Sequence, residues 1–473
     1  MRATAQRAFV AGWKDLERWV IPTRLLLVRR LPQGWSFVRV SQFVRQVEQR
    51  VRVEAGKEYP MIGVKWYGEG TFLRETVKGE ALSAAYVTPV IPNAFIYNRL
   101  FAWKGSFAVV PEEHQGCFVS NEFPQFTVDE QLILPRYLYL FFMCDSTIRV
   151  VDASSIGSAA VSRNRFREDA FLDFEIPLPP IPVQRAIVEQ WEKAQKAICD
   201  TGKRVERLEE ENVARFYSDL GIVQKDYRDR SKAFAVMWKD LERWSVSFMG
   251  DMVTGLGCSP LSLYPYSRLG ELATVSYGIQ KSPANRPGQH PRPYLRVANV
   301  RKGYLDLSEI KEINVPDGEM DTYRLEPGDI LFVEGNGSRS ELGRVAMWNG
   351  EIPNCVHQNH LIKVRVNTSL LLPEFAMTWF NTDVGRVHFF RSAKTSSVLG
   401  TINSGEVRSA PIPLPPLDVQ WKIVRNVEKR RAEIAQRQGK ARRLAVAIER
   451  EVEEMIVGIR PVPEAIGLQK TSV

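Results

Sequence analysis

The sequence has few cysteines, and they are scattered. The 473 residues include five, at Cys117, Cys144, Cys199, Cys258 and Cys355, and none of them forms a C-x-x-C pair. An odd, dispersed set argues against a disulfide framework and against a zinc ribbon. The cysteine usage therefore predicts a protein of a reducing compartment, the cytoplasm.

The sequence also lacks a long apolar run. The most apolar stretch, Leu132–Cys144, contains Pro135 and Arg136 and is too short to cross a bilayer, so it predicts a buried helix. The first residues have no apolar segment of the signal-peptide type. No membrane role is expected.

Two catalytic loops are missing as well. No [ND]-P-P-[YF] tetrapeptide is present, the loop with which amino-methyltransferases hold a flipped base. No G-x-x-x-x-G-K-[ST] phosphate loop is present either, which argues against ATP hydrolysis by this chain. We therefore predict no catalytic residues and no cofactor in this chain.

What the sequence has in excess is positive charge. It carries 64 Lys and Arg against 55 Asp and Glu, for a net charge of +9. A basic surplus favours a polyanionic partner, although charge alone does not identify it as nucleic acid. Hydrophobic residues make up 44% of the chain, enough to bury sizeable cores, and the length suggests about two to four domains.

The most informative feature is an internal repeat. WKDLERW occurs at Trp13–Trp19 and again at Trp238–Trp244, and IPLPP occurs at Ile176–Pro180 and again at Ile412–Pro416. Between these repeats the match is faint but ordered. Met61–Gly70 aligns with Tyr294–Gly303, and Ser120-Asn121 falls near Gln358-Asn359. The chain is therefore a duplication with similar frames and divergent middles.

Each IPLPP precedes a long amphipathic segment. After the first, apolar residues recur at helical spacing from Ile187 to Leu208, and after the second they recur every seven residues from Val427 to Met455. Proline cannot continue inside a helix, so each helix begins after its proline pair. Two such stripes favour a coiled coil, with separate helices packed on the domains as the alternative.

The divergent middles combine predicted strands and helices. Tyr294–Val300, Asp329–Val333, Arg344–Trp348 and Leu361–Val366 have the β-branched, partly alternating pattern of strands. Pro373–Asn381 and Pro135–Cys144 have the pattern of helices opened by proline. Both middles therefore predict mixed α/β domains.

This arrangement resembles the specificity subunit of type I restriction-modification systems. The resemblance is carried by the two IPLPP segments with Gln184 and Gln420 after them, by Tyr294–Val300 and by His357–His360, and in the first half by Phe95–Arg99, Trp103–Ser106 and Val119–Pro124. It covers nearly the whole chain. WKDLERW is not part of the family pattern, and its role stays open.

The resemblance implies an α+β fold in which two α/β target recognition domains are separated by two long helices that form an antiparallel coiled coil, with pseudo-two-fold symmetry. We expect an N-terminal segment at 1–25, recognition domains at 26–175 and 251–411, and helical regions at 176–250 and 412–473. The resemblance also implies double-stranded DNA, two modification subunits and restriction/translocase subunits as partners. S-adenosylmethionine, ATP and Mg²⁺ would belong to those subunits.

The expected DNA-binding residues are of the types that contact bases and phosphates: Arg and Lys, Asn and Gln, and small hydroxyls. Gln358 and Asn359 are the favoured base contacts, and the arginine cluster at 163–167 is the favoured phosphate contact. The full set is Arg99, Lys104, Ser106, Ser120, Asn121, Arg163, Arg165, Arg167, Gln280, Lys281, Ser338, Arg339, Arg344, His357, Gln358, Asn359, His360, Lys394, Thr395 and Ser396.

Residues on the two helices are expected to dock the modification subunits: Gln184, Ile187, Trp191, Gln420, Ile423 and Val427. No metal site is predicted. Cys355, His357 and His360 offer three ligand types, but they have no matching set in the first half.

Two other functions stay open from the residues alone. The chain could be a single-chain DNA methyltransferase or nuclease with an unrecognised motif, or a structural adaptor whose variable domains bind protein. Methyl transfer by the purified chain would favour the first. DNA binding that weakens with salt would exclude the second.

Overall fold

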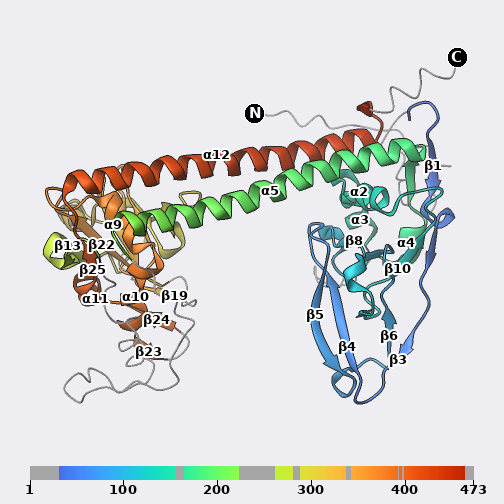
Figure 1. Ribbon diagram of the computed structural model, residues 1–473, viewed down its shortest axis with the longest axis horizontal. Coiled ribbons are helices and arrows are strands. Elements are labelled where there is room, and N and C mark those ends of the chain that lie inside the picture. The colour runs from blue at the N-terminus through green and yellow to red at the C-terminus, as the bar shows by residue number, and fades with distance from the viewer. Residues whose placement is uncertain are drawn as a thin grey trace. The chain divides into compact units, whose positions relative to one another are not determined.

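The computed structural model describes residues 31–155, 165–222, 262–280, 288–336, 342–392, 394–396 and 399–463. Both copies of WKDLERW lie outside these residues. The chain divides into two compact units. Unit 1 comprises residues 1–203 and 438–473, and unit 2 comprises residues 204–437. Figure 1 shows the elements by residue colour.

Unit 1 begins with strands and ends with helices. Its elements before the first long helix are β1 (Ser36–Arg39), η2 (Val40–Gln42), β2 (Val44–Gln46), β3 (Val51–Arg52), β4 (Glu58–Val64), β5 (Thr71–Lys78), η3 (Gly79–Ala81), β6 (Tyr86–Pro89), β7 (Phe95–Tyr97), η4 (Ala102–Lys104), β8 (Phe107–Val109), η5 (Glu112–His114), β9 (Phe118–Val119), β10 (Gln125–Val128), α2 (Pro135–Met143), α3 (Asp145–Ser154), α4 (Glu168–Leu172) and β11 (Glu175–Leu178).

Unit 2 follows a similar order. Its elements before the second long helix are β12 (Tyr266–Arg268), α7 (Leu269–Leu272), β13 (Ala273–Tyr277), β14 (Pro291–Leu295), η8 (Val297–Asn299), β15 (Val300–Arg301), β16 (Tyr304–Leu305), β17 (Lys311–Asn314), η9 (Asp317–Glu319), α8 (Met320–Tyr323), β18 (Ile330–Val333), β19 (Gly335–Asn336), β20 (Val345–Met347), β21 (Val356–His357), β22 (Leu361–Val366), α9 (Pro373–Phe380), α10 (Asp383–Ser392), β23 (Lys394–Ser396), β24 (Leu399–Thr401), α11 (Ser404–Ser409) and β25 (Pro411–Pro413).

The two units have the same central sheet. In unit 1 the strand order is β2-β10-β7-β8, and in unit 2 it is β13-β22-β18-β20. A second sheet also matches, since β4 pairs in parallel with β9 in unit 1 and β14 pairs in parallel with β21 in unit 2. In each unit the strand of the IPLPP segment pairs with the first strand, β11 with β1 and β25 with β12. The duplication expected from sequence is confirmed in the topology.

Two long helices complete both units. They are α5 (Ile181–Asp219) and α12 (Leu417–Ile456), and each begins after its proline pair. In unit 2, Val205 and Leu208 of α5 pack with Ile434 of α12, and further along α5 the carbonyl of Glu211 accepts a hydrogen bond from Arg430. Later residues of α5 thus contact earlier residues of α12, so the helices pair antiparallel as expected. In unit 1, Gln190 of α5 donates a hydrogen bond to Glu451 of α12.

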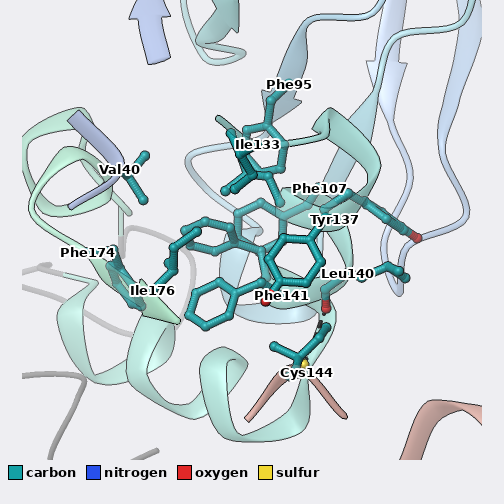
Figure 2. Close-up of a cluster of buried hydrophobic side chains, with 14 of the residues drawn as sticks. Val40, Phe95, Phe107, Ile133, Tyr137, Leu140, Phe141, Cys144, Phe174 and Ile176 are labelled. Carbon is teal, nitrogen blue, oxygen red and sulfur yellow. Dashed lines mark hydrogen bonds between the residues drawn. The ribbon is translucent and has the colours of Figure 1, made fainter. Parts of the chain in front are cut away.

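The core of unit 1 is rich in aromatic rings. Figure 2 shows Tyr137 and Phe141 of α2 beside Phe107 of β8, with Phe174 and Ile176 nearby. Neighbouring Phe95 and Phe171 stack with ring centroids 5.4 Å apart. The same core includes Ile448, Val452, Met455 and Ile456 from the end of α12. Burial of these large apolar surfaces is the main stabilising contribution to the unit.

One predicted strand is shorter than expected. Tyr294–Val300 was predicted as continuous, but β14 ends at Leu295 and a 3-10 turn follows at Val297–Asn299. The Asn299 side chain accepts a hydrogen bond from the Arg296 backbone N–H at 2.9 Å and donates to the carbonyls of Asp306 and Glu309. These bonds satisfy the backbone locally and take the place of hydrogen bonds to a neighbouring strand, as short polar side chains often do.

Candidate nucleic-acid interface

The predicted loops of unit 2 meet at one end of its central sheet. Tyr277, the last residue of β13, lies opposite Ile362, and Val333, the last residue of β18, lies opposite Leu361. Val345, the first residue of β20, lies opposite Phe332. The loops that follow β13 and β18 and precede β20 and β22 therefore share this end. We call it the loop end of the unit.

Three predicted segments of unit 2 lie at its loop end. They are the chain up to Gln280, the loop with His357–His360, and β23, which joins through β24 to β19 just past β18. Gln280 is exposed. Lys281, Ser338 and Arg339 lie outside the described residues, and of Lys394, Thr395 and Ser396 only the strand itself is described.

Unit 1 has the same loop end. Tyr97, the last residue of β7, lies opposite Phe107, the first residue of β8, and its backbone N–H donates to the Pro124 carbonyl just before β10. The loops 98–106 and 120–124 therefore lie together. Phe166 joins them, because its N–H donates to the Arg99 carbonyl at 3.0 Å. The structure thus brings together the segments that hold Arg99, Lys104, Ser120, Asn121, Arg165 and Arg167.

The loop Ser120-Asn121 is the structural equivalent of Gln358-Asn359. Met61 pairs in parallel with Phe118, and Tyr294 pairs in parallel with Val356, so the loops begin two residues later in each unit. Each then makes the same turn, in which the Ser120 and Gln358 carbonyls accept the N–H three residues ahead at 3.1 and 2.9 Å. The alignment predicted from sequence is confirmed. Asn121 is exposed, and the other three residues are half-buried.

Among the residues that the structure describes, three of the predicted DNA contacts are buried. Ser106 is fully buried and its hydroxyl donates to the Val64 carbonyl at 3.0 Å. Arg344, 6% exposed, donates to the Val297 carbonyl at 3.2 Å. The structure therefore gives both side chains an internal role that sequence reasoning did not foresee. The two residues are at equivalent positions: Ser106, directly before β8, binds the last residue of β4, and Arg344, directly before β20, binds the chain just after β14.

His357 is the third, and it is fully buried. Its Nδ1 lies 3.1 Å from the Tyr323 carbonyl, which can only accept, so Nδ1 carries the proton. Burial, together with the charge of Lys363, lowers the pKa of His357 to about 3. The imidazole is therefore a neutral core group. The equivalent residue in unit 1 is Val119, which is also fully buried.

The arginines of the unit 1 loop end face carboxylates. Arg165 makes two hydrogen bonds to Glu122, at 2.8 and 3.3 Å, and these raise its already high pKa. Arg167 lies 3.5 Å from Asp169, and Arg99 pairs with Glu168. Arg163, the remaining arginine of the predicted cluster, lies outside the described residues. The cluster is thus partly neutralised within the chain. In unit 2, the imidazole of His360 lies 2.7 Å from Glu334.

Lys104 belongs to an aromatic cluster that sequence reasoning missed. Its Nζ lies 3.8 Å from the ring centroid of Trp66, and the Trp66 ring lies 5.0 Å from that of Phe101. Next to Trp66, Tyr67 is 70% exposed and has a φ of +54°, a left-handed conformation that costs a side-chain-bearing residue about 1–2 kcal/mol. The sequence Trp66-Tyr67-Gly68 next to Lys65 was the available signal.

The residues predicted to dock partner subunits face inwards. Gln184 is fully buried: its Oε1 accepts from the Leu134 N–H, and its Nε2 donates to the carbonyls of Leu132 and Pro179, all at 2.9 Å. Gln420 repeats this arrangement with Leu372, Leu370 and Pro415 at 2.8–2.9 Å. Each glutamine fixes its helix to the turn before a proline-opened helix, α2 or α9.

The apolar members of that set are also internal. Ile187 packs in the core of unit 1, and Ile423 and Val427 pack in the core of unit 2. Trp191 is half-buried against Tyr139, with ring centroids 6.0 Å apart. The docking assignment is therefore corrected for these residues, because their side chains are already used within the chain. The exposed large apolar side chains in the described parts of the two long helices are instead Val213 of α5 and Trp421, Leu444 and Val446 of α12.

The three possible metal ligands do not converge. Cys355 is buried among apolar side chains of unit 2, while His357 and His360 bind different oxygen atoms. Among the described residues there is no group of three His, Cys, Asp or Glu arranged to hold a metal ion. In the same residues, no helix is long and apolar enough to cross a membrane.

Comparison with known proteins connects this geometry to a family. The model of the type I restriction modification DNA specificity domain matches residues 32–209 and again 264–441. The type I restriction enzyme EcoKI specificity subunit of Escherichia coli K12 is 25% identical over 274 residues, 58% of this chain and 54% of that protein. The StySPI specificity subunit of Salmonella potsdam is 26% identical over 306 residues, 63% of this chain and 59% of that protein.

The match therefore spans only a little over half the length of these relatives. A solved chain from work on complex assembly and conformational transition of the type I R-M system covers 90% of this chain and 97% of its own length. Its TM-score is 0.55 at 15% identity, which shows a shared fold. Since the two matched segments together cover more than half of the sequence, the chain belongs to the type I restriction modification DNA specificity family and carries two copies of its domain.

Proposed function

We propose that the chain is the DNA-recognising specificity subunit of a type I restriction-modification complex, and that each unit recognises one half of a bipartite target. The observation that supports this most is that the two units share one architecture but carry different residues in equivalent loops. Both units have the same sheet and the same glutamine-fixed helix, but equivalent loops carry Ser120-Asn121 in one and Gln358-Asn359 in the other. Asn and Gln are the side chains that bind adenine in the major groove.

The proposal assigns no catalysis to this chain. Two modification subunits would supply S-adenosylmethionine and the methylation site, and restriction/translocase subunits would supply ATP- and Mg²⁺-dependent steps, in the cytoplasm. Trp421, Leu444 and Val446 on α12 are the candidate contacts for the modification subunits, because they are exposed and apolar. Methyl transfer by the purified chain without partners would contradict the proposal.

Methylome sequencing of a host that carries this chain with its modification partner tests the central claim. We expect methylation at a bipartite sequence with a fixed spacer. Asn121→Ala should relax recognition in one half-site and Gln358→Ala in the other, each by about 1–3 kcal/mol of discrimination. Gln438→Ala, an exposed position on α12, is the matched control. Relaxation of the same half-site by both variants would refute the division of labour.

A second experiment tests the binding mode. The affinity of the purified chain for duplex DNA should fall as salt rises, because bound phosphates release counterions. Affinity that is independent of salt would instead favour an adaptor that binds protein.

A third experiment tests the helices as a spacer. Removing one heptad from each of α5 and α12 keeps their antiparallel register and shortens each by about 10 Å, which corresponds to about three base pairs. We expect a shorter preferred spacer with both half-sites unchanged, in a variant that still folds and supports methylation. Altered half-sites with the original spacer would contradict this role.

A further inference from the structure

An exposed aromatic turn lies at the loop end of unit 1. It follows β4 and spans residues 65–70, with Tyr67 70% exposed at its tip and Trp66 42% exposed beside it. The Tyr67 hydroxyl has no hydrogen-bond partner in the part of the chain that the structure describes. The Tyr67 ring is large, exposed and next to the predicted DNA-binding loops, which indicates a function other than core packing.

The turn is held firmly in place. The Tyr67 and Gly68 N–H groups donate to the carbonyls of Lys104 and Gly105 at 2.8 and 2.9 Å, and the Tyr139 hydroxyl donates to the Gly68 carbonyl at 2.8 Å. These bonds fasten residues 65–70 to the 98–106 loop. Tyr67 therefore keeps its left-handed backbone because the surrounding contacts determine it, and its exposed side chain starts from a fixed backbone position.

Unit 2 exposes an aromatic side chain directly after the equivalent turn, residues 298–303. After β14, the β15–β16 hairpin exposes Tyr304 to 62%. This turn is fixed to the start of β20, since the Gly303 N–H donates to the Val345 carbonyl at 2.9 Å. Gly70 and Gly303, which align in the sequence repeat, both have a φ of +83°. By this alignment Tyr67 corresponds to Val300 and Tyr304 corresponds to Thr71, so each unit exposes a tyrosine within three residues of the same glycine, before it in unit 1 and after it in unit 2.

We propose that Tyr67 and Tyr304 contact duplex DNA with their rings and set the orientation of each unit on its half-site. This inference rests on the proposed function. Both turns lie at the loop end beside the loops that contain Asn121 and Asn359, so DNA bound there reaches them as well. A basic residue is near each tyrosine: Lys104, whose Nζ lies over the ring of Trp66 next to Tyr67, and the exposed Lys302, two residues before Tyr304 in the sequence.

The chemistry of this contact is independent of sequence. A ring packs on a deoxyribose or on the face of a base at a distorted step, and an ammonium group beside it contacts a phosphate. Such contacts fix register and angle and carry no base code. Loss of either ring should therefore weaken binding without changing the target.

The test compares DNA affinity and target sequence in full-length variants. We expect Tyr67→Ala and Tyr304→Ala each to weaken binding of a duplex with the complete target on the order of tenfold. Tyr67→Phe should stay within about twofold of the parent, because the ring makes the contact. Tyr67→Asn removes the ring in a residue that tolerates a left-handed φ, and should behave like Tyr67→Ala.

Leu132→Ala and Leu370→Ala are matched controls. These leucines are exposed to 46% and 45%, and they lie at the opposite end of the sheet, beside Gln184 and Gln420. We expect parental affinity from both, and an unchanged methylated sequence in all variants. Thermal unfolding verifies that each variant folds.

Three outcomes overturn the inference: parental affinity in the alanine variants, a loss in Tyr67→Phe equal to that in Tyr67→Ala, or a changed target sequence. Failure of the parent chain to bind DNA would instead refute the proposed function, so the two failures are distinguishable.

Discussion

The two units differ far more at one end of their central sheets than at the other. Next to the helices, the same residue types make the same bonds: a buried glutamine binds the turn before a proline-opened helix in both. At the loop end, equivalent positions hold different residues, such as Val119 and His357, or Ser106 and Arg344. The end next to the helices therefore maintains the fold in both units, whereas the loop end accommodates different residues in each.

Removing the buried glutamine next to the long helix of either unit should have the largest effect on stability. Gln184→Ala and Gln420→Ala each leave one N–H and two carbonyls at buried or part-buried positions without their partner, so we expect each to lower the free energy of unfolding by about 3 kcal/mol. Denaturant unfolding of the purified chain measures this. Gln438→Ala in unit 1 and Gln436→Ala in unit 2 are exposed controls on α12 and should change stability little. A large loss in only one of the two variants would show that the units are not equivalent here.

Buried His357 should give unit 2 a pH-dependent contribution to stability that Val119, at the equivalent position, does not give unit 1. The pKa of His357 is lowered to about 3 in the folded chain, mainly by burial, whereas an unfolded histidine titrates near 6.5. Between these values the unfolded chain binds the extra proton, so this contribution to stability is complete above about pH 6.5 and is lost as pH falls.

From pH 7 to pH 5 the parent should therefore lose about 2 kcal/mol more stability than His357→Asn, which keeps a donor for the Tyr323 carbonyl but does not titrate. Denaturant unfolding at the two pH values provides the measurement. Val119→Ile is the control in unit 1, because Val119→Asn would bury a new polar group. Val119→Ile keeps His357, so it should lose as much stability as the parent between pH 7 and pH 5. Equal acid sensitivity in the parent and His357→Asn would rule out this source.

The smallest expected effect is on DNA affinity, when the carboxylate that neutralises Arg165 is removed. Glu122→Gln removes the carboxylate that binds Arg165 at the loop end of unit 1. We expect tighter DNA binding with a steeper salt dependence, by up to about one unit of the logarithmic slope, because Arg165 becomes available to a phosphate. Both ends of this ion pair are solvent-accessible, so stability should change little. Glu113→Gln, also exposed, adds the same net charge and should leave the slope closer to that of the parent.

The repeat, the long helices and the position of the loops could be predicted from the sequence, because each depends on periodicity or order along the chain. The pairing of Ser120-Asn121 with Gln358-Asn359 followed from the same alignment. The inward role of Gln184 could not, since a polar residue on a helix is equally compatible with solvent, a partner or a backbone amide. Only the fold shows that Leu134, fifty residues earlier, supplies the N–H that it accepts.

Residue type alone also led to wrong predictions of DNA contacts at the loop end. Ser106, Arg344 and His357 have the chemistry of DNA contacts, but their burial depends on chain segments that are distant in sequence. Tyr67 was overlooked for the opposite reason, because an aromatic residue is by default expected in the core.

Each long helix is divided between the two units, and this has a consequence for how the chain folds during synthesis. Unit 2, residues 204–437, is a continuous segment, so it can complete its core as soon as α12 begins to emerge from the ribosome. Unit 1 begins the chain but needs Ile448, Val452 and Met455 to close its core. The first half to be synthesised is therefore the last to be finished, and a nascent chain that stops before residue 438 leaves unit 1 with an open, aromatic-rich interior.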